Sequence, residues 1–217
     1  MPTNQHILLA ARPKGEVKPT DFELVEAPMP EPAEGEILVE VQYLALEPAM
    51  KGWMEARVDY VAPVEIGDVM RGNALGRVVQ SRDPQYPEGT LVMGGLGWRR
   101  YAAGNAGALG LHPVPAGVDP LAAMNVLGIT GLTAYFGMLD IGKPVAGDTV
   151  LVSGAAGATG SVAGQLARIA GARVVGIAGG RDKCDWLVSE LGFDAAIDYK
   201  SEDTAARVAE ACPDGLN

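Results

Sequence analysis

The chain has 217 residues, of which 48% are hydrophobic and 20% charged, so it is long and apolar enough for one large or two small folded domains. Its 17 Lys and Arg against 27 Asp and Glu give a net charge of −10, which argues against nucleic acid or an anionic membrane as a partner. No apolar run approaches the roughly 20 residues that cross a bilayer, and the start lacks a signal-peptide pattern, so we expect a cytoplasmic protein. Two Cys and two His exclude a disulfide scaffold and leave little for a metal centre.

The first half of the chain, up to about Pro120, is rich in proline and glycine and predicts short strands. In one of them Ile37, Val39, Val41 and Tyr43 alternate with other residues, as in a half-buried strand. The strands are expected at Ile7–Ala10, Glu23–Glu26, Glu36–Leu46, Leu75–Gln80 and Thr90–Met93. We therefore expect a twisted, barrel-like β-domain over residues 1–122.

After Pro120 the hydrophobic period lengthens, and strands alternate with helices. Leu132, Tyr135, Phe136 and Leu139 have the spacing of an amphipathic helix. Strands are expected at Thr149–Ser153, Arg173–Ala178 and Ala195–Tyr199. One helix is expected between the first two strands, with Val162, Leu166 and Ile169 on one face, and further helices are expected at Lys183–Leu191 and Asp203–Ala211. This alternation predicts a parallel sheet of right-handed βαβ units over residues 123–217, which makes the chain an α/β protein.

A glycine-rich turn joins the first of these strands to its helix. It matches the dinucleotide-binding pattern G-x-G-x-x-G, with Ala155, Gly157 and Gly160 in the three glycine positions. Gly157 would let the backbone approach a pyrophosphate, and Gly160 would let the helix pack close to the strand. The helix N-terminus would offer free N–H groups to the phosphates. The alternative is a tight turn in an α/β domain without a nucleotide.

The end of the second strand indicates which dinucleotide is bound. NAD-binding folds usually place an acidic residue there to hold the ribose hydroxyls, whereas this chain has Gly179–Gly180 followed by Arg181 and Lys183. Space and cations suit a 2′-phosphate, so NADP is favoured over NAD; otherwise the two cations are simply solvated. Asp182 is interpreted as a helix cap, and Tyr199 either flanks the ribose phosphate or is an ordinary strand-end aromatic.

Several longer stretches resemble one enzyme family. They are Tyr43–Met54, Val64–Gly72, Gly128–Pro144, Val175–Cys184, Leu191–Lys200 and Cys212–Gly215, together with the glycine-rich turn. The chain is similar to the zinc-independent medium-chain dehydrogenase/reductases, in the branch of prostaglandin reductases, alkenal double-bond reductases and bacterial NADP-dependent oxidoreductases. The absence of cysteine from the first half agrees with the lack of a zinc site.

The resemblance implies a GroES-like β-domain, a Rossmann domain and hydride transfer from NADPH to the C=C bond of an α,β-unsaturated aldehyde or ketone. It implies that Gly157, Ala158, Thr159 and Gly160 face the pyrophosphate, that Lys183 and Tyr199 hold the 2′-phosphate, and that Thr130 and Thr133 approach the nicotinamide. Tyr60, Gly97 and Trp98 would lie near the substrate, although barrel packing explains Tyr60 and Trp98 equally well. A homodimer is expected.

Family members continue beyond the stretch that resembles Cys212–Gly215. About a third of the expected chain is absent, including the tyrosine usually assigned to catalysis, and the strand Thr149–Ser153 is expected to lie at an open sheet edge. No catalytic residue is therefore assigned. The alternative function is that of a truncated, non-catalytic fragment that binds NADPH or only a partner chain.

Overall fold

The computed structural model describes residues 3–57 and 61–216. The chain divides into two units, Met1–Pro120 and Leu121–Asn217, and the division falls at the start of helix α2 (Pro120–Met124). The sequence placed the boundary after residue 122. None of the helices within the described ranges is long and apolar enough to cross a membrane.

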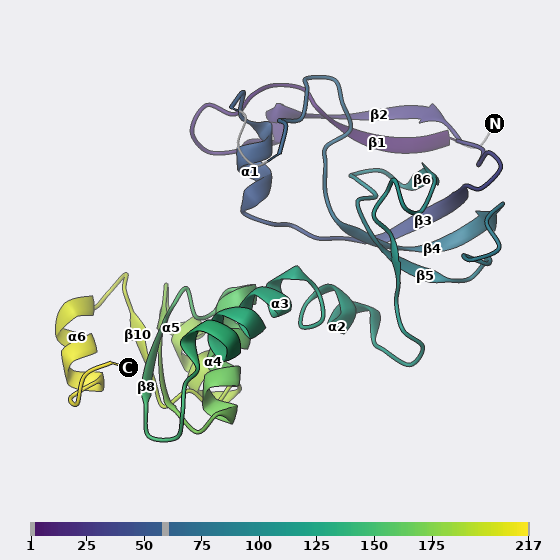
Figure 1. Cartoon of the computed structure of the whole chain (residues 1–217). Coiled ribbons are helices and arrows are strands. Elements are labelled where there is room, and N and C mark those ends of the chain that lie inside the picture. The colour runs from purple at the N-terminus through teal and green to yellow at the C-terminus, as the bar shows by residue number, and fades with distance from the viewer. Residues whose placement is uncertain (1–2, 58–60, 217) are drawn as a thin grey trace. The chain divides into compact units, whose positions relative to one another are not determined.

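The first unit is built from antiparallel strands (Figure 1). A five-stranded sheet has the order β6-β3-β4-β5-β7, and β1 pairs with β2 in a separate ribbon. The elements are β1 (Thr3–Leu9), η1 (Pro19–Asp21), β2 (Phe22–Pro28), β3 (Ile37–Leu44), α1 (Ala49–Met54), β4 (Ala74–Ser81), β5 (Leu91–Gly94), β6 (Tyr101–Gly104) and β7 (His112–Pro113). The β-domain expected for this half is confirmed, although it also contains the short helices α1 and η1.

Strand β3 shows how the alternating pattern builds this core. Ile37 and Val39 are fully buried, and they pack with residues of β4 and β5. Tyr43 was expected on the same face, but about half of it is exposed. The pairing of β3 with β4 shifts register between Val41 and Tyr43, which breaks the two-residue period.

The second unit contains a three-stranded parallel sheet in the order β10-β9-β8, as the βαβ pattern predicts. Strands β8 and β10 are the edge strands of this sheet, as expected for β8. The elements are α3 (Ile129–Tyr135), η2 (Phe136–Gly142), β8 (Thr149–Ser153), α4 (Ala158–Ile169), β9 (Arg173–Ala178), α5 (Arg181–Ser189), β10 (Ala195–Asp198) and α6 (Thr204–Ala211).

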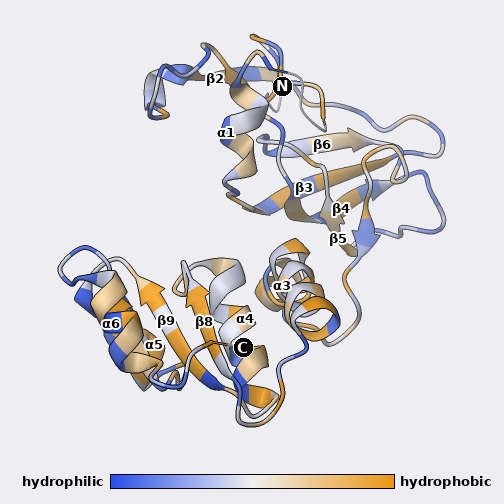
Figure 2. Ribbon diagram, turned by 60° about the vertical axis from the view of Figure 1, so that its left-hand side comes forward, coloured by the Kyte–Doolittle hydropathy of each residue, from blue (hydrophilic) through white to orange (hydrophobic). Residues whose placement is uncertain are grey.

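Helices cover both faces of this sheet. On one face Val174 of β9 packs with Ala167 of α4 and Leu187 of α5. On the other face Val175 and Ile197 pack against α6. Figure 2 shows that β8 and β9 are hydrophobic along most of their length, as strands covered on both faces require.

The buried side of α4 differs from the predicted one. Val162, Leu166 and Ile169 were expected to mark it, but Ile169 is 82% exposed, and the buried residues are Gly164 and Ala167. The ring of Phe193 lies directly over Gly164, so a Cβ atom there would overlap the ring. The helix packs through its smallest residues and therefore lies close to its neighbours.

Helix α3 also packs through small residues. Gly131 and Ala134 are buried, and a Cβ atom on Gly131 would overlap the carbonyl group of Val126. The predicted apolar face is on the other side, where Leu132 and Tyr135 are about half exposed. After Tyr135 the helix continues as the π-helical η2. The expected helix is confirmed, but its apolar face is only partly covered by the residues that the structure describes.

The contact between Gly164 and Phe193 can be tested by substitution. Gly164→Ala should lower the free energy of unfolding of the second unit by about 1–3 kcal/mol, because the Phe193 ring must move. Gly137→Ala is the matched control, since nothing lies within 4 Å of a Cβ atom at this helical position. Chemical denaturation of both variants would measure the difference, and equal stabilities would contradict the packing.

Candidate functional site

The turn from β8 into α4 is the centre of the candidate site. Gly154 has a left-handed conformation (φ 61°), and its carbonyl oxygen accepts the N–H of Gly157 at 2.8 Å. The N–H of Ala155 donates to the carbonyl oxygen of Ile177 on β9 at 3.0 Å, which fixes the turn to the sheet. Sequence reasoning placed the first position of the pattern at Ala155 and did not assign Gly154, whose left-handed backbone favours glycine.

Gly160 permits the close approach of α4 to the end of β8. A Cβ atom at this position would overlap the carbonyl oxygen of Gly154 and lie 2.9 Å from the Cα atom of Ala155. Gly157 is the residue preceding the helix, with extended backbone angles, and a Cβ atom there would lie 3.1 Å from the same carbonyl oxygen. The spacing of these glycines therefore has a direct steric cause.

The first turn of α4 has free hydrogen-bond donors. The N–H groups of Ala158, Thr159 and Gly160 have no carbonyl one turn earlier in the helix to bind. No side chain caps this end, and the first turn contains no acidic residue. The positive end of the helix dipole adds to the donors. The residues present thus fit a phosphate or pyrophosphate group.

The end of β9 meets the end of β10 beside this turn. Gly179 faces the ring of Tyr199, which would lie 2.8 Å from a Cβ atom on Gly179. The N–H of Tyr199 donates to the carbonyl oxygen of Ala178 at 3.1 Å. Tyr199 remains 56% exposed, so one side of the ring is open to solvent. The structure brings together two of the residues that the sequence associated with a 2′-phosphate.

Two cations follow at the start of α5. The Arg181 side chain is 89% exposed, with its Nε atom 3.7 Å from a carboxylate oxygen of Asp185. Lys183 is exposed and makes no ion pair with any residue that the structure describes. The interpretation of Asp182 as the cap is wrong: the helix starts at Arg181, and the capping residue is Gly180, which has no side chain to offer.

Asp198, at the end of β10, is a site residue that sequence reasoning missed. Its Oδ1 atom accepts the N–H groups of Gly180 at 2.8 Å and Lys200 at 3.0 Å, and its Oδ2 atom accepts the Ser201 hydroxyl at 2.8 Å. These donors hold the pKa of the carboxyl group below its ordinary value, and the N–H of Gly180 has the largest effect. Asp198 is therefore a carboxylate bound to the turn between β9 and α5.

Thr130 and Thr133 lie on α3. The hydroxyl of Thr130 donates to the carbonyl oxygen of Asn125 at 3.2 Å, and that of Thr133 to the carbonyl oxygen of Ile129 at 2.7 Å. The Thr133 hydroxyl thus uses its proton within α3, and the Thr130 hydroxyl uses its proton on the turn that precedes α3. Their oxygen lone pairs remain available as acceptors.

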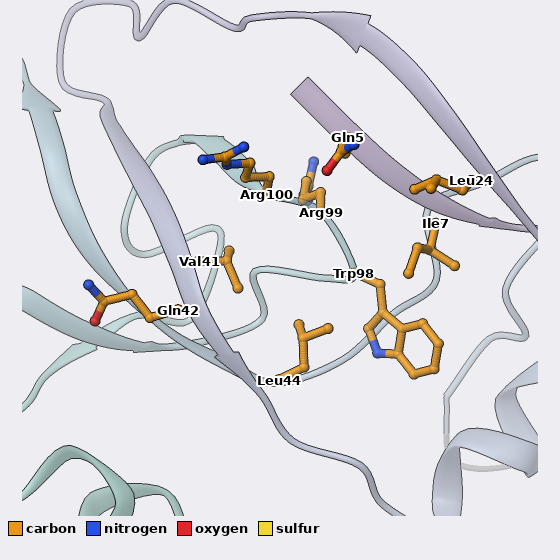
Figure 3. Close-up of a pocket in the computed structure, with 9 residues that line it drawn as sticks. All are labelled: Gln5, Ile7, Leu24, Val41, Gln42, Leu44, Trp98, Arg99 and Arg100. Carbon is orange, nitrogen blue, oxygen red and sulfur yellow. The ribbon is translucent and has the colours of Figure 1, made fainter. Parts of the chain in front are cut away.

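The residues expected near a substrate lie in the first unit. Trp98 stacks on Phe22 with ring centroids 5.3 Å apart, and its Nε1 atom is buried without a hydrogen-bond partner. Figure 3 shows Trp98, the neighbour of Gly97, at one side of a cavity of about 390 Å³. The cavity is lined by Gln5, Ile7, Leu24, Val41, Gln42, Leu44, Trp98, Arg99 and Arg100. Tyr60 lies outside the described residues.

The arginines of this cavity differ in their surroundings. Burial lowers the pKa of Arg99, and its Nε atom donates to the carbonyl oxygen of Leu96 at 2.7 Å. Burial, with a smaller contribution from Arg99, also lowers the pKa of His6. Arg100 is more exposed and lies 3.9 Å from a carboxylate oxygen of Glu40. Arg99 is thus a partly desolvated cation at the cavity wall.

Within residues 3–57 and 61–216, no group of three or more His, Cys, Asp and Glu side chains is placed to hold a metal ion. Both cysteines, Cys184 and Cys212, are buried and free. Burial raises the pKa of the Cys184 thiol, which keeps it protonated and consistent with a packing role.

Comparison with known proteins identifies the family. Residues 5–111 match the family described as the N-terminal domain of oxidoreductase, and residues 158–217 match the family described as zinc-binding dehydrogenase. The NADPH-dependent curcumin reductase of Escherichia coli (strain K12) is 41% identical over 217 aligned positions, covering 99% of this chain and 62% of that protein. Prostaglandin reductase 1 of Bos taurus is 39% identical, covering 91% of this chain and 59% of that protein.

A solved structure agrees with these relatives. The crystal structure of CurA in complex with NADPH from Vibrio vulnificus superposes with a TM-score of 0.91 at 39% identity, covering 98% of this chain and 63% of that chain. This chain therefore spans about three fifths of the length of the relatives it matches. It consists of a GroES-like domain and the start of a Rossmann domain, and it belongs to the medium-chain dehydrogenase/reductase superfamily, in the branch of the prostaglandin and curcumin reductases.

Proposed function

We propose that the chain binds NADP(H) between the first turn of α4 and the joined ends of β9 and β10. The observation that carries this proposal is the uncapped first turn of α4, which Gly160 brings against the end of β8. Its free N–H groups would bind the pyrophosphate. Local donors of this kind are needed because the chain carries a net charge of −10 and would otherwise repel an anionic coenzyme.

The 2′-phosphate would lie beside Gly179, Arg181, Lys183 and Tyr199. An acid that selects NAD belongs at the end of the second strand, and here the space beside Gly179 is filled by the Tyr199 ring. Lys183 has no competing ion pair among the described residues, and the contact of Arg181 with Asp185 is an exposed pair of little energetic value. Both cations are therefore free to approach a phosphate.

The proposed reaction is reduction of the C=C bond of an α,β-unsaturated aldehyde or ketone. NADPH, when bound, would supply the hydride. Thr130 and Thr133 would accept hydrogen bonds near the nicotinamide, and Tyr60, Gly97 and Trp98 would line the substrate side. Trp98 lines the cavity of the first unit, and its Nε1 atom is a buried donor without a hydrogen-bond partner. Hydrogen-bond donors, rather than zinc, would activate the carbonyl group, because the first half contains no cysteine for a zinc site.

A second candidate function is that of a non-catalytic chain that binds NADPH or a partner chain. It is favoured by the open edge of β8, which another strand could pair with. The names of the relatives, NADPH-dependent curcumin reductase and prostaglandin reductase 1, favour the catalytic alternative. A homodimer and a cytoplasmic location remain predictions.

Lys183→Ala tests the coenzyme preference. The substitution should weaken binding of NADPH by about tenfold or more and leave binding of NADH nearly unchanged, because only NADPH carries the 2′-phosphate. Calorimetric titration of both coenzymes would measure this, with Lys183→Arg as the variant that keeps the charge. Equal losses for NADPH and NADH would contradict the proposed 2′-phosphate site.

Gly160→Ala tests the pyrophosphate site. The added methyl group would push the first turn of α4 away from Gly154, so both NADPH and NADH should bind about tenfold more weakly or worse. Gly137→Ala, where a methyl group meets no other atom within 4 Å, should bind both coenzymes as the unchanged chain does. Unchanged affinity in Gly160→Ala would show that the pyrophosphate lies elsewhere.

Turnover separates the two candidate functions. Oxidation of NADPH in the presence of a simple enal, followed by absorbance at the nicotinamide band, should be measured on this chain and on a version extended to the length of its relatives. We expect the extended version to oxidise NADPH in the presence of the enal. Failure of both would refute the reductase assignment, whereas failure of this chain alone would support the non-catalytic alternative.

A further inference from the structure

At Gly180, the turn between β9 and α5 is held by hydrogen bonds of its backbone groups and not by side-chain packing. Gly180 has a φ angle of 110°, which side chains rarely tolerate, and nothing lies within 4 Å of where its Cβ atom would be. No side chain caps α5. The N–H of Gly180 would therefore lack a partner if Asp198 did not accept it.

The position of Asp198 is itself fixed by hydrogen bonds to Glu202 and, through it, to α6. Its N–H donates to a carboxylate oxygen of Glu202 at 2.7 Å, and the other oxygen of Glu202 accepts the Nε–H of Arg207 at 2.8 Å. A chain of hydrogen bonds thus runs from α6 through Glu202 and Asp198 to Gly180. The Asp198 carboxylate is held in place before any ligand arrives.

Three of the roughly four acceptor positions of the Asp198 carboxylate are already in use. Two backbone N–H groups and the Ser201 hydroxyl bind its two oxygens, and two of these three donors come from its own loop. The carboxylate is thus engaged with the protein and is not directed at a ribose hydroxyl, the usual partner of an acid in NAD-binding sites. Its bond to Gly180 joins the loop after β10 to the turn that begins α5.

This turn sets the position of the proposed 2′-phosphate residues. The carbonyl oxygen of Gly180 accepts the N–H groups of Lys183 and Cys184, each at 3.2 Å, so the start of α5 follows the orientation of Gly180. Gly179 lies against Tyr199, the residue after Asp198. A single carboxylate thereby ties the glycine pair, the aromatic ring and the cation of Lys183 to one another.

We propose that Asp198 is a positioning residue for the 2′-phosphate: it fixes the Gly179–Gly180 turn so that Lys183 and Tyr199 bind that phosphate, without touching the coenzyme itself. The inference rests on the proposed binding of NADP(H). It opposes the simple electrostatic expectation, in which removing a negative charge from this region would strengthen binding of a phosphate.

The test compares adenosine 2′,5′-bisphosphate with adenosine 5′-monophosphate, which differ only in the 2′-phosphate, by calorimetric titration of the full chain. Asp198→Ala should weaken binding of the bisphosphate by about tenfold and change binding of the monophosphate less than about threefold, because only the 2′-phosphate uses the turn. Asp198→Asn keeps an oxygen acceptor for Gly180 and should recover most of the discrimination.

Asp194→Ala is the matched control. Asp194 also accepts a backbone N–H, that of Val174 at 2.7 Å. Val174 lies at the start of β9, at the opposite end of the strand from the Gly179–Gly180 turn. Its replacement should cost comparable stability and leave the preference for the bisphosphate unchanged. Ser201→Ala, which removes only the hydroxyl bound to Oδ2, tests the same network if Asp198→Ala does not fold, and should reduce the preference by a smaller factor.

The outcomes distinguish this inference from the function on which it rests. If the unchanged chain binds both nucleotides equally, the NADP(H) assignment fails, and the role of Asp198 fails with it. If the unchanged chain prefers the bisphosphate and Asp198→Ala keeps or increases that preference, only the positioning role is overturned. If Asp198→Ala loses the preference for the bisphosphate and Asp194→Ala keeps it, the positioning role of Asp198 is established.

Discussion

The structure of the second unit depends on the contact between the carbonyl group of Gly154 and the Cα atom of Gly160. Because residue 160 has no side chain, α4 begins directly against the end of β8. The same helix continues with Gly164 and Ala167 on its buried side, which keeps it close to the sheet along its length. Its first-turn N–H groups are consequently presented at the strand end, where a phosphate can reach them.

Much of this fold could be predicted from the sequence. The strands at Thr149–Ser153 and Arg173–Ala178 have the predicted bounds, because each is an apolar run that glycine or a charged turn interrupts. The face of α4 could not be predicted by the same reasoning. A hydrophobic pattern assigns burial to the largest apolar residues, whereas a helix this close to its neighbours buries its smallest ones, and Ile169 is left in solvent.

The residues of the candidate site also include some that the sequence could predict and one that it could not. The glycines near Gly157 and the cations near Lys183 are local patterns, and the sequence was sufficient to suggest their chemistry. The meeting of Gly179 with Tyr199 depends on the pairing of two strands, which the repeated strand–helix pattern made foreseeable. Asp198 could not be found in this way, because its bond to Gly180 joins residues 18 positions apart in the chain, and no local residue pattern marks such a bond.

The Tyr199 ring over Gly179 has a consequence for redesign of coenzyme preference. The usual strategy for converting an NADP-type fold to NAD is to install a carboxylate at the end of the second strand. Here any side chain at position 179 would collide with the aromatic ring, so a single exchange would disturb the strand ends before it could reach a ribose. Conversion would therefore also require the ring at position 199 to move or be replaced by a smaller residue, so the two positions would have to be redesigned together.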